Sequence, residues 1–177
     1  MTPIPSPTIQ TQLGELRIRP STPDDSQAFF AVLRNISAWI DEQKSTQWIP
    51  GAHDNDILWV NQVVQDGTAY VVEYDEQVIA TLRLAWSLPG YWHMDGRSAG
   101  YISTVYVRRD FAHQAIGTGM ILWAEDFIRQ RNRMFSYLDC YAENTTLCAY
   151  YEGMGYVSMG DVETYPDYNQ RLYNKQV

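Results

Sequence analysis

The stretch TVYVRRDFAHQAIGTGMILWAE (residues 104–125) joins a strand pattern rich in β-branched and aromatic residues to a helix pattern through a short loop. Two glycines, Gly117 and Gly119, lie where this helix is expected to begin. The first amides of a helix have no partner within it and carry a partial positive charge. Because neither glycine has a β-carbon, a phosphate could approach those amides closely. The alternative explanation is a tight turn, or close packing of the helix on a sheet.

The patterns on both sides of this stretch predict one domain that mixes strands and helices. Strands are expected at 15–22, 68–87 (as a hairpin), 99–107, 135–144, 156–165 and 169–176, and helices at 22–43, 55–67, from Gly117 onward and at 145–155. The strand–helix–strand unit at 101–143 implies a parallel strand pair with a right-handed crossover. The other neighbours look antiparallel, so we expect a mixed sheet with helices on both faces.

Length and charge narrow the class of protein. A chain of 177 residues is long enough for one domain with a sizeable core. Residues 1–12 contain three prolines and no charge and lack the regions of a signal peptide, so they predict a flexible leader before a single domain at 13–177. The formal net charge of −8 argues against non-specific nucleic-acid binding and suits a cationic substrate, although acidity can also serve solubility alone. No run of 18 apolar residues occurs, so no membrane span is expected.

Several binding classes lack their sequence patterns. The chain contains neither G-K-[ST], which marks a P-loop, nor the dinucleotide fingerprint G-x-G-x-x-G. No Cys/His cluster has the spacing of a zinc site, so no metal site is expected. The two cysteines, Cys140 and Cys148, fall in a strand pattern and a helix pattern, so we expect no disulfide framework and a reducing cytoplasm.

The segment VRRDFAHQAIGTGM (107–120) resembles motif A of the GNAT superfamily, the acetyl-CoA-dependent N-acetyltransferases. In that motif a strand valine and a turn precede R/Q-x-x-G-x-G/A at the start of a helix, and Gln114, Gly117 and Gly119 hold this register. The order of the expected elements also agrees with the family over nearly the whole chain after the leader.

A second segment, ENTTLCAYYEGMGY (143–156), is similar to the family's N-x-x-A-x-x-x-Y-x-x-x-G-F/Y pattern. Asn144, Tyr151, Gly155 and Tyr156 match it in spacing, while Leu147 replaces the alanine. Either pattern alone is weak, but the two in order, separated by one helix and one strand, identify the chain as a member of the superfamily.

The resemblance implies a GNAT-like α/β fold: a mixed, mostly antiparallel sheet of six to seven strands with a central parallel pair and helices on both faces. It implies acetyl-CoA as cosubstrate, bound by Val105, Tyr106, Val107, Gln114, Ala115, Ile116, Gly117, Thr118, Gly119 and Asn144. In the family, the strand before motif A splays from its parallel neighbour, and the pantetheine arm binds there like an added strand. A strand amide, here near Val105, would polarise the thioester carbonyl.

Two positions depart from the family pattern. Ala112 stands where many members carry an arginine that binds phosphate, and Arg108 or Arg109 in the same loop could substitute for it. Ala115 stands where members carry another glycine, and its methyl group is tolerable unless the position needs a positive φ.

Acetylation of an amine needs a proton donor for the departing thiolate and a proton acceptor for the amine. Tyr151 matches the family's acid, and a phenol stays protonated at neutral pH and can protonate a thiolate. Asp139 lies twelve residues before it, at the strand position of an acidic base in members that acetylate protein amino termini. A carboxylate in mid-strand is unfavourable in a covered sheet unless it is paired or used, so an ion pair with an arginine, or a solvated position, is the alternative. The other candidates for the base are Glu73, Glu143, His93, water and, less favoured because of its place in the pyrophosphate loop, His113.

The acceptor groove of the family lies beside the first helix pair and the central strands. The corresponding segments here mix aromatic and acidic residues: Trp39, Asp41, Glu42, Trp48, Trp86, Tyr91, Trp92 and Asp95. Such a groove suits an ammonium group through cation–π contacts and charge, so we expect a small-molecule or peptide amine, although several of these aromatics could be packing residues. A catalytically inactive CoA-binding sensor and a transferase of longer acyl groups are alternatives, and the resemblance allows a homodimer.

Overall fold

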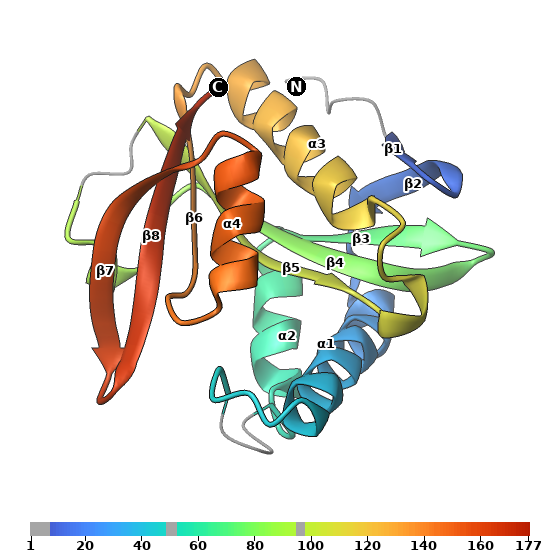
Figure 1. Cartoon of the computed structure of the whole chain (residues 1–177). Helices are drawn as coiled ribbons and strands as arrows, with labels where there is room; N and C mark the ends of the chain where they lie inside the picture. Colours follow the sequence, from blue (N-terminus) through green and yellow to red (C-terminus); the bar gives the residue numbers. More distant parts are fainter. Residues whose placement is uncertain (1–7, 49–52, 95–97) are drawn as a thin grey trace.

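The computed structural model describes residues 8–48, 53–94 and 98–177 (Figure 1). The strands are β1 (Thr8–Thr11), β2 (Gly14–Pro20), β3 (Ala69–Tyr74), β4 (Gln77–Ala85), β5 (Ala99–Val107), β6 (Phe135–Tyr141), β7 (Val157–Tyr165) and β8 (Tyr168–Gln176). The helices are α1 (Ser26–Glu42), α2 (Ile57–Gln65), α3 (Ile116–Gln130) and α4 (Thr145–Gly153), with short 3-10 turns η1 (Pro23–Asp25), η2 (Gly90–Trp92) and η3 (Arg109–Phe111). None of the helices in these ranges is long and apolar enough to cross a membrane.

The strands form one open sheet in the order β1-β2-β3-β4-β5-β6-β8-β7. Every neighbouring pair is antiparallel except β5 and β6, which are parallel. The expected mixed, mostly antiparallel sheet with a central parallel pair is therefore confirmed, with eight strands in place of six to seven.

The prediction of a flexible leader over residues 1–12 needs correction, because residues 8–11 form the additional strand β1. Residues 8–11 pair with β2, and of the predicted leader only residues 1–7 lie outside the described part of the chain. Ile9 is buried against the core that α3 covers, and the Gln12 amide donates to the Gln114 carbonyl at 2.9 Å. The buried side chain of Ile9 and the backbone hydrogen bonds between β1 and β2 thus hold a segment that its composition predicted to be flexible.

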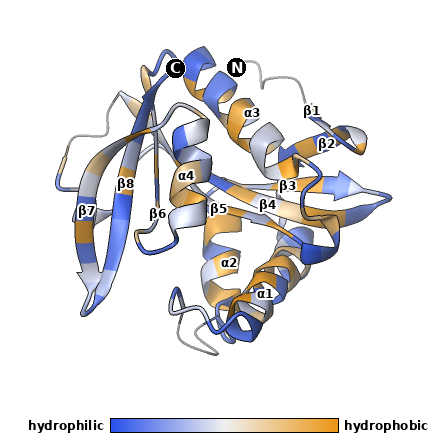
Figure 2. Cartoon of the chain, in the orientation of Figure 1, coloured by the Kyte–Doolittle hydropathy of each residue, from blue (hydrophilic) through white to orange (hydrophobic). Residues whose placement is uncertain are grey.

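Helices cover both faces of the sheet, as expected (Figure 1). On one face α1 and α2 pack through Phe29, Leu33 and Val60, and on the other α3 and α4 cover the larger core. The five apolar residues that mark each long helical pattern in the sequence are all buried: Phe29, Val32, Leu33, Ile36 and Ile40 in α1, and Met120, Ile121, Ala124, Phe127 and Ile128 in α3. Figure 2 shows hydrophobic and hydrophilic bands along the same helices.

The parallel pair is short, and this shapes the centre of the molecule. Strands β5 and β6 pair only from Ala99–Phe135 to Tyr101–Tyr137. Beyond that point β6 pairs with β8 alone, while β5 continues to Val107 against β4 through an irregular register between Thr81 and Arg83. Thr104 has a φ of 49° in this irregular part, and Thr81 Oγ1 donates to its carbonyl at 3.3 Å. The two strands therefore diverge with their facing edges unpaired (Figure 1).

Candidate active site

The two glycines at the start of α3 serve different purposes. A β-carbon at Gly119 would lie 3.0 Å from the Gln10 carbonyl oxygen and 3.2 Å from Ile9 Cβ, so this glycine permits close packing of α3 on β1. A β-carbon at Gly117 would have the Tyr150 hydroxyl as its nearest neighbour, at 3.5 Å, an ordinary contact. Gly117 is therefore not required by packing, and its missing side chain leaves the first amides of α3 accessible.

Ala115 occupies the N-cap of α3 in the left-handed region, with φ 60° and ψ 16°. A β-carbon makes this conformation unfavourable by about 1–2 kcal/mol, which glycine would avoid. The backbone at Ala115 is thus strained, because the loop keeps the left-handed conformation that the family's glycine would adopt without strain. His113, two residues earlier, also has a positive φ of 63°.

The arginines proposed to replace the missing phosphate ligand have other partners. Arg108 donates to both carboxylate oxygens of Asp110 and to Gln77. The Arg109 guanidinium lies over the Trp39 ring, 3.9 Å from its centroid. Nothing in these contacts directs either guanidinium to the start of α3.

The Tyr150 hydroxyl forms a hydrogen bond of 3.0 Å with Thr118 Oγ1. The bond joins α4 to the first turn of α3 beside Gly117. Thr118 is thus held at the place that the sequence predicted for the pyrophosphate.

The end of β5 follows the alternation of a strand. Val105 and Val107 pack against the core under α3 and α4, whereas Tyr106 packs against the cluster of α1 and α2. The strand therefore presents two faces in the part that has separated from β6, with the valines on the side of α4.

Tyr151 lies on α4 and is buried, with 7% of its surface exposed. Its ring packs against Tyr156 and Tyr173. Burial raises the pKa of its hydroxyl well above the usual value, and nearby ionisable groups that include Tyr106 and Asp139 raise it further. Tyr151 is therefore a protonated phenol at neutral pH.

Asp139 lies on β6 and receives three hydrogen bonds at one oxygen, Oδ2. The donors are the Tyr91 hydroxyl at 3.0 Å, Trp92 Nε1 at 2.9 Å and the Tyr101 hydroxyl at 2.9 Å. Burial raises the pKa of the carboxyl, and the three donors act in the opposite direction. Among the described residues no salt bridge reaches Asp139, so its partners there are neutral.

Comparison with known proteins agrees with this geometry. The model of the acetyltransferase (GNAT) family matches residues 33–156, more than half of the chain. The chain belongs to the GNAT family. It is 28% identical over 147 residues to the uncharacterized N-acetyltransferase YesJ of Bacillus subtilis (strain 168), covering 80% of this chain and 81% of that protein. Family membership makes the protein a transferase and agrees with acetyl-CoA as its cosubstrate.

Solved structures show the same fold. A GNAT acetyltransferase from Listeria monocytogenes 4b F2365 superimposes with a TM-score of 0.80 at 23% identity, covering 96% of this chain and 99% of the other. The PaiA N-acetyltransferase from Thermoplasma acidophilum, solved in complex with coenzyme A, gives a TM-score of 0.72 at 14% identity over 92% and 99% of the two chains.

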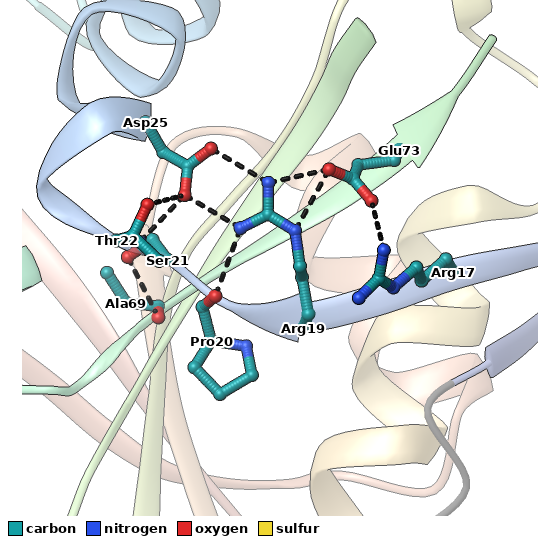
Figure 3. Close-up of polar contacts among 8 residues, drawn as sticks. All are labelled: Arg17, Arg19, Pro20, Ser21, Thr22, Asp25, Ala69 and Glu73. Atoms are coloured by element: carbon teal, nitrogen blue, oxygen red, sulfur yellow. Dashed lines mark hydrogen bonds and ion pairs between the residues drawn. The ribbon is translucent and has the colours of Figure 1, made fainter. Parts of the chain in front are cut away.

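In this GNAT chain the other candidate bases lie in different surroundings. Glu73 accepts from the Arg19 guanidinium at 2.6 Å and lies 3.5 Å from Arg17 (Figure 3). Glu143 is exposed and accepts from the Tyr141 hydroxyl at 2.9 Å. His93 and His113 are exposed residues of loops. Asp139 is the candidate that is half-buried and has neutral partners among the described residues.

The aromatic and acidic residues predicted for the acceptor groove do not form one group. Tyr91 and Trp92 lie at Asp139, and Trp48 packs edge-on against Tyr106. Trp86, in contrast, packs on Phe127 of α3, on the other side of the sheet. Trp39 lies under Arg109, Asp41 and Glu42 end α1, and Asp95 falls outside the described residues.

Asn144, predicted to bind the cofactor, has two structural partners. Its Oδ1 accepts from the Leu147 amide and caps α4, and its Nδ2 donates to Gln47 Oε1 at 3.1 Å. Beside it Thr46 Oγ1 lies 2.8 Å from the Tyr141 hydroxyl, in a groove of about 390 Å³ between the end of α1 and the start of α4. The side chain of Asn144 thus ties α4 to the segment that follows α1.

Sequence reasoning missed one pair of residues, His53 and Asp56, on the side of the sheet that α1 and α2 cover. His53 Nδ1 lies 2.6 Å from Asp56 Oδ2, and His53 Nε2 is buried without a hydrogen-bond partner in the described ranges. The His53 ring contacts Trp48, with centroids 4.2 Å apart, and Trp48 contacts Tyr106. The three-residue spacing within an irregular loop has no period that could have indicated this pair.

Proposed function

We propose that the protein transfers the acetyl group of acetyl-CoA to the nitrogen of a primary amine by direct attack within a ternary complex. One observation carries the proposal: β5 and β6 separate beyond the Tyr101–Tyr137 pair, and Asp139 lies on β6 just beyond that pair, where its hydrogen-bond donors among the described residues are neutral. A half-buried carboxylate beside an unpaired strand edge, with the buried phenol of Tyr151 as the acid, suits acyl transfer from an extended thioester.

The first turn of α3 and the end of β5 would hold acetyl-CoA. The free amides that follow Ala115 carry the partial positive charge that a pyrophosphate needs, and Gly117 leaves room for it. The unpaired edge of β5 up to Val107 has the amides and carbonyls that a pantetheine arm can bind as an added strand.

The acceptor ammonium first gives one proton to Asp139, which passes it to solvent. The neutral nitrogen then attacks the thioester carbon and loses a second proton to Asp139, while the C–S bond breaks and the thiolate takes a proton from Tyr151, which is reprotonated from solvent. An amine with a pKa of about 10.4 is almost wholly protonated at pH 7, so forming its neutral, reactive form costs about 4–5 kcal/mol. A lysine-like acceptor therefore needs the base most. Asp139, whose pKa is raised by burial, is better matched to this role than an exposed aspartate.

The acceptor in this proposal is a small-molecule or peptide amine that is cationic before reaction. Support comes from the net charge of −8 and from the acidic and aromatic residues around the opening, among them Trp48, Tyr106 and Asp56. The cytoplasmic location and the homodimer stay predictions of the sequence.

The test begins with binding. Calorimetry with acetyl-CoA should show binding that Gly117→Asp abolishes, because the new carboxylate would repel the pyrophosphate. Gly153→Asp is the matched control, since a β-carbon there meets no atom within 4 Å and Gly153 is the last residue of α4. Equal affinity of the two variants would remove the start of α3 from the binding site.

Turnover is measured next, as thiol release across a panel of amines. Tyr151→Phe should lower kcat about 100-fold and leave the Kd for acetyl-CoA unchanged, because the ring stays and only the proton donor is lost. Binding of acetyl-CoA without thiol release in the presence of any amine would instead favour a CoA-binding sensor. Thiol release only from a longer acyl-CoA would make that compound the acyl donor.

A further inference from the structure

The hydrogen bonds at Asp139 come from two separate elements. Tyr91 and Trp92 belong to η2, and Tyr101 belongs to β5, in register with Tyr137 of β6. All three reach Oδ2, and the Tyr91 and Tyr101 hydroxyls lie 3.3 Å from each other. Two side chains of a loop without regular periodicity thus donate to the same oxygen, Asp139 Oδ2, on the sheet.

Two of the three donors are buried and held by ring packing. Trp92 is 4% exposed and stacks on Tyr137 with centroids 5.2 Å apart and an angle of 13° between the rings. Tyr101 is also buried, and its ring meets Trp92 edge-on. Side chains held in this way keep the carboxylate in one orientation, because any rotation of Asp139 would break several hydrogen bonds at once.

The groups around Asp139 stay neutral over a wide range of pH. The titratable side chains that interact with its charge are Tyr91, Tyr101, Tyr106, Cys140, Tyr151 and Tyr168. Each has a pKa raised above its usual value, chiefly by burial. Near neutral pH these partners therefore donate hydrogen bonds or fill space without adding charge.

We infer that Tyr91, Trp92 and Tyr101 are positioning residues that keep Asp139 ionised and oriented inside a buried site, so that it can take a proton from an acceptor that arrives as an alkylammonium ion. The inference deepens the proposed function and its catalytic part rests on it. Neutral donors stabilise the carboxylate and leave its charge uncancelled, whereas an arginine would cancel it. A site of this kind favours aliphatic amines, which are cations at neutral pH, over weakly basic aryl amines.

The first experiment needs no acceptor. In the full-length chain labelled with carboxyl-¹³C aspartate, the Asp139 signal is assigned by its loss in Asp139→Asn and titrated by NMR. Tyr101→Phe and Tyr91→Phe should each move the midpoint to higher pH, by about one pH unit, because a donor to the charged form is lost. Tyr137→Phe is the matched control. Tyr137 stacks on Trp92 but is not one of the three donors, so the midpoint should stay in place. An unmoved midpoint in both donor variants overturns the inference.

The second experiment measures the pH dependence of kcat/KM with the best alkylamine from the panel. The acidic limb should move to higher pH in Tyr101→Phe by the same amount as the NMR midpoint, and should not move in Tyr137→Phe. A shifted NMR midpoint with an unshifted acidic limb means that Asp139 is not the proton acceptor, which overturns the catalytic part of the inference. If no amine is acetylated, the proposed function fails while the NMR titration still decides whether the three donors hold the charge.

Discussion

Two carboxylate sites in this chain show how neighbours decide the use of an acidic residue. In one site Arg19 of β2 lies between Asp25 of η1 and Glu73 of β3, with contacts of 2.6–2.9 Å to the two carboxylates (Figure 3). In the other, Asp139 has three neutral donors at similar distances. Hydrogen-bond geometry is good in both sites, and a main difference between them is the charged guanidinium donor that Asp25 and Glu73 share and Asp139 lacks among the described residues.

The consequence appears in the pKa values of the two aspartates. The Arg19 side chain holds the pKa of Asp25 down at about 2, with further help from Thr22. Burial raises the pKa of Asp139, and its neutral donors only partly oppose this. Asp25 therefore stabilises the fold in its charged form and is a weak proton acceptor, whereas the charge of Asp139 is unfavourable for folding and available for chemistry.

The largest effect should follow from Asp139→Asn. An amide oxygen can still accept from Tyr101 and Trp92 but cannot take a proton, so kcat for a lysine-like amine should fall about 10²–10⁴-fold. The free energy of unfolding at pH 7 should not decrease, because an unfavourable charge is removed. Steady-state kinetics and urea denaturation check the two parts. A stability loss as large as that of an arginine-paired aspartate would show that the two sites are alike after all.

The arginine site should respond in the opposite way. Arg19→Met leaves Asp25 and Glu73 without their main partner and should lower the free energy of unfolding by about 2 kcal/mol, below the cost of breaking a fully buried pair because the Arg19 side chain is 21% exposed. The turnover of the folded protein should stay unchanged. A fall in kcat without a fall in stability would move the reaction centre toward β2 and β3, against the proposed site.

Much of the fold could be predicted because long helices and strands carry their periodicity in the sequence. The apolar positions of α1 and α3, the hairpin of β3 and β4 and the parallel strand unit are all visible there. Strand β1 was not, since in four residues only Ile9 faces the core and its neighbours are polar. The backbone bonds of an edge strand do not depend on side-chain type, so composition does not show them.

The candidate site divides in the same way. Gly117 and Asp139 could be singled out from the glycine spacing and the alternation of β6, and Tyr151 from the resemblance to the family pattern. The partners of Asp139 could not, because η2 lies in a loop whose aromatics have no periodicity and whose contact with β6 spans more than 40 residues. Sequence reasoning weighed an ion pair or a solvated position against use as a base, and the neutral donors of Asp139 are a further arrangement that only the fold reveals.

Acid titration sharpens the comparison further. The pKa of Asp25 is lowered in the folded protein, so its contribution to stability is complete above about pH 4 and is lost as the pH falls toward 2. The difference in unfolding free energy between the wild type and Arg19→Met should therefore shrink over that range. Urea denaturation at pH 5, 4, 3 and 2.5 measures it. A constant difference would mean that Arg19 acts by packing and not through the charge of its partners.

The smallest effect is expected from Glu73→Gln, which tests Glu73 against Asp139 as the base. Arg19 keeps Asp25 as a bidentate partner, and the amide oxygen of the new side chain can still accept one bond, so the loss of stability should stay below about 1 kcal/mol. Turnover and its pH dependence should match those of the wild type, because a carboxylate bound to two arginines is not the proton acceptor. Thermal unfolding and kcat against pH measure both quantities. A shift of the acidic limb in this variant, together with none in Asp139→Asn, would reverse the roles assigned to the two sites, since the arginine-paired carboxylate would then be the one that titrates during catalysis.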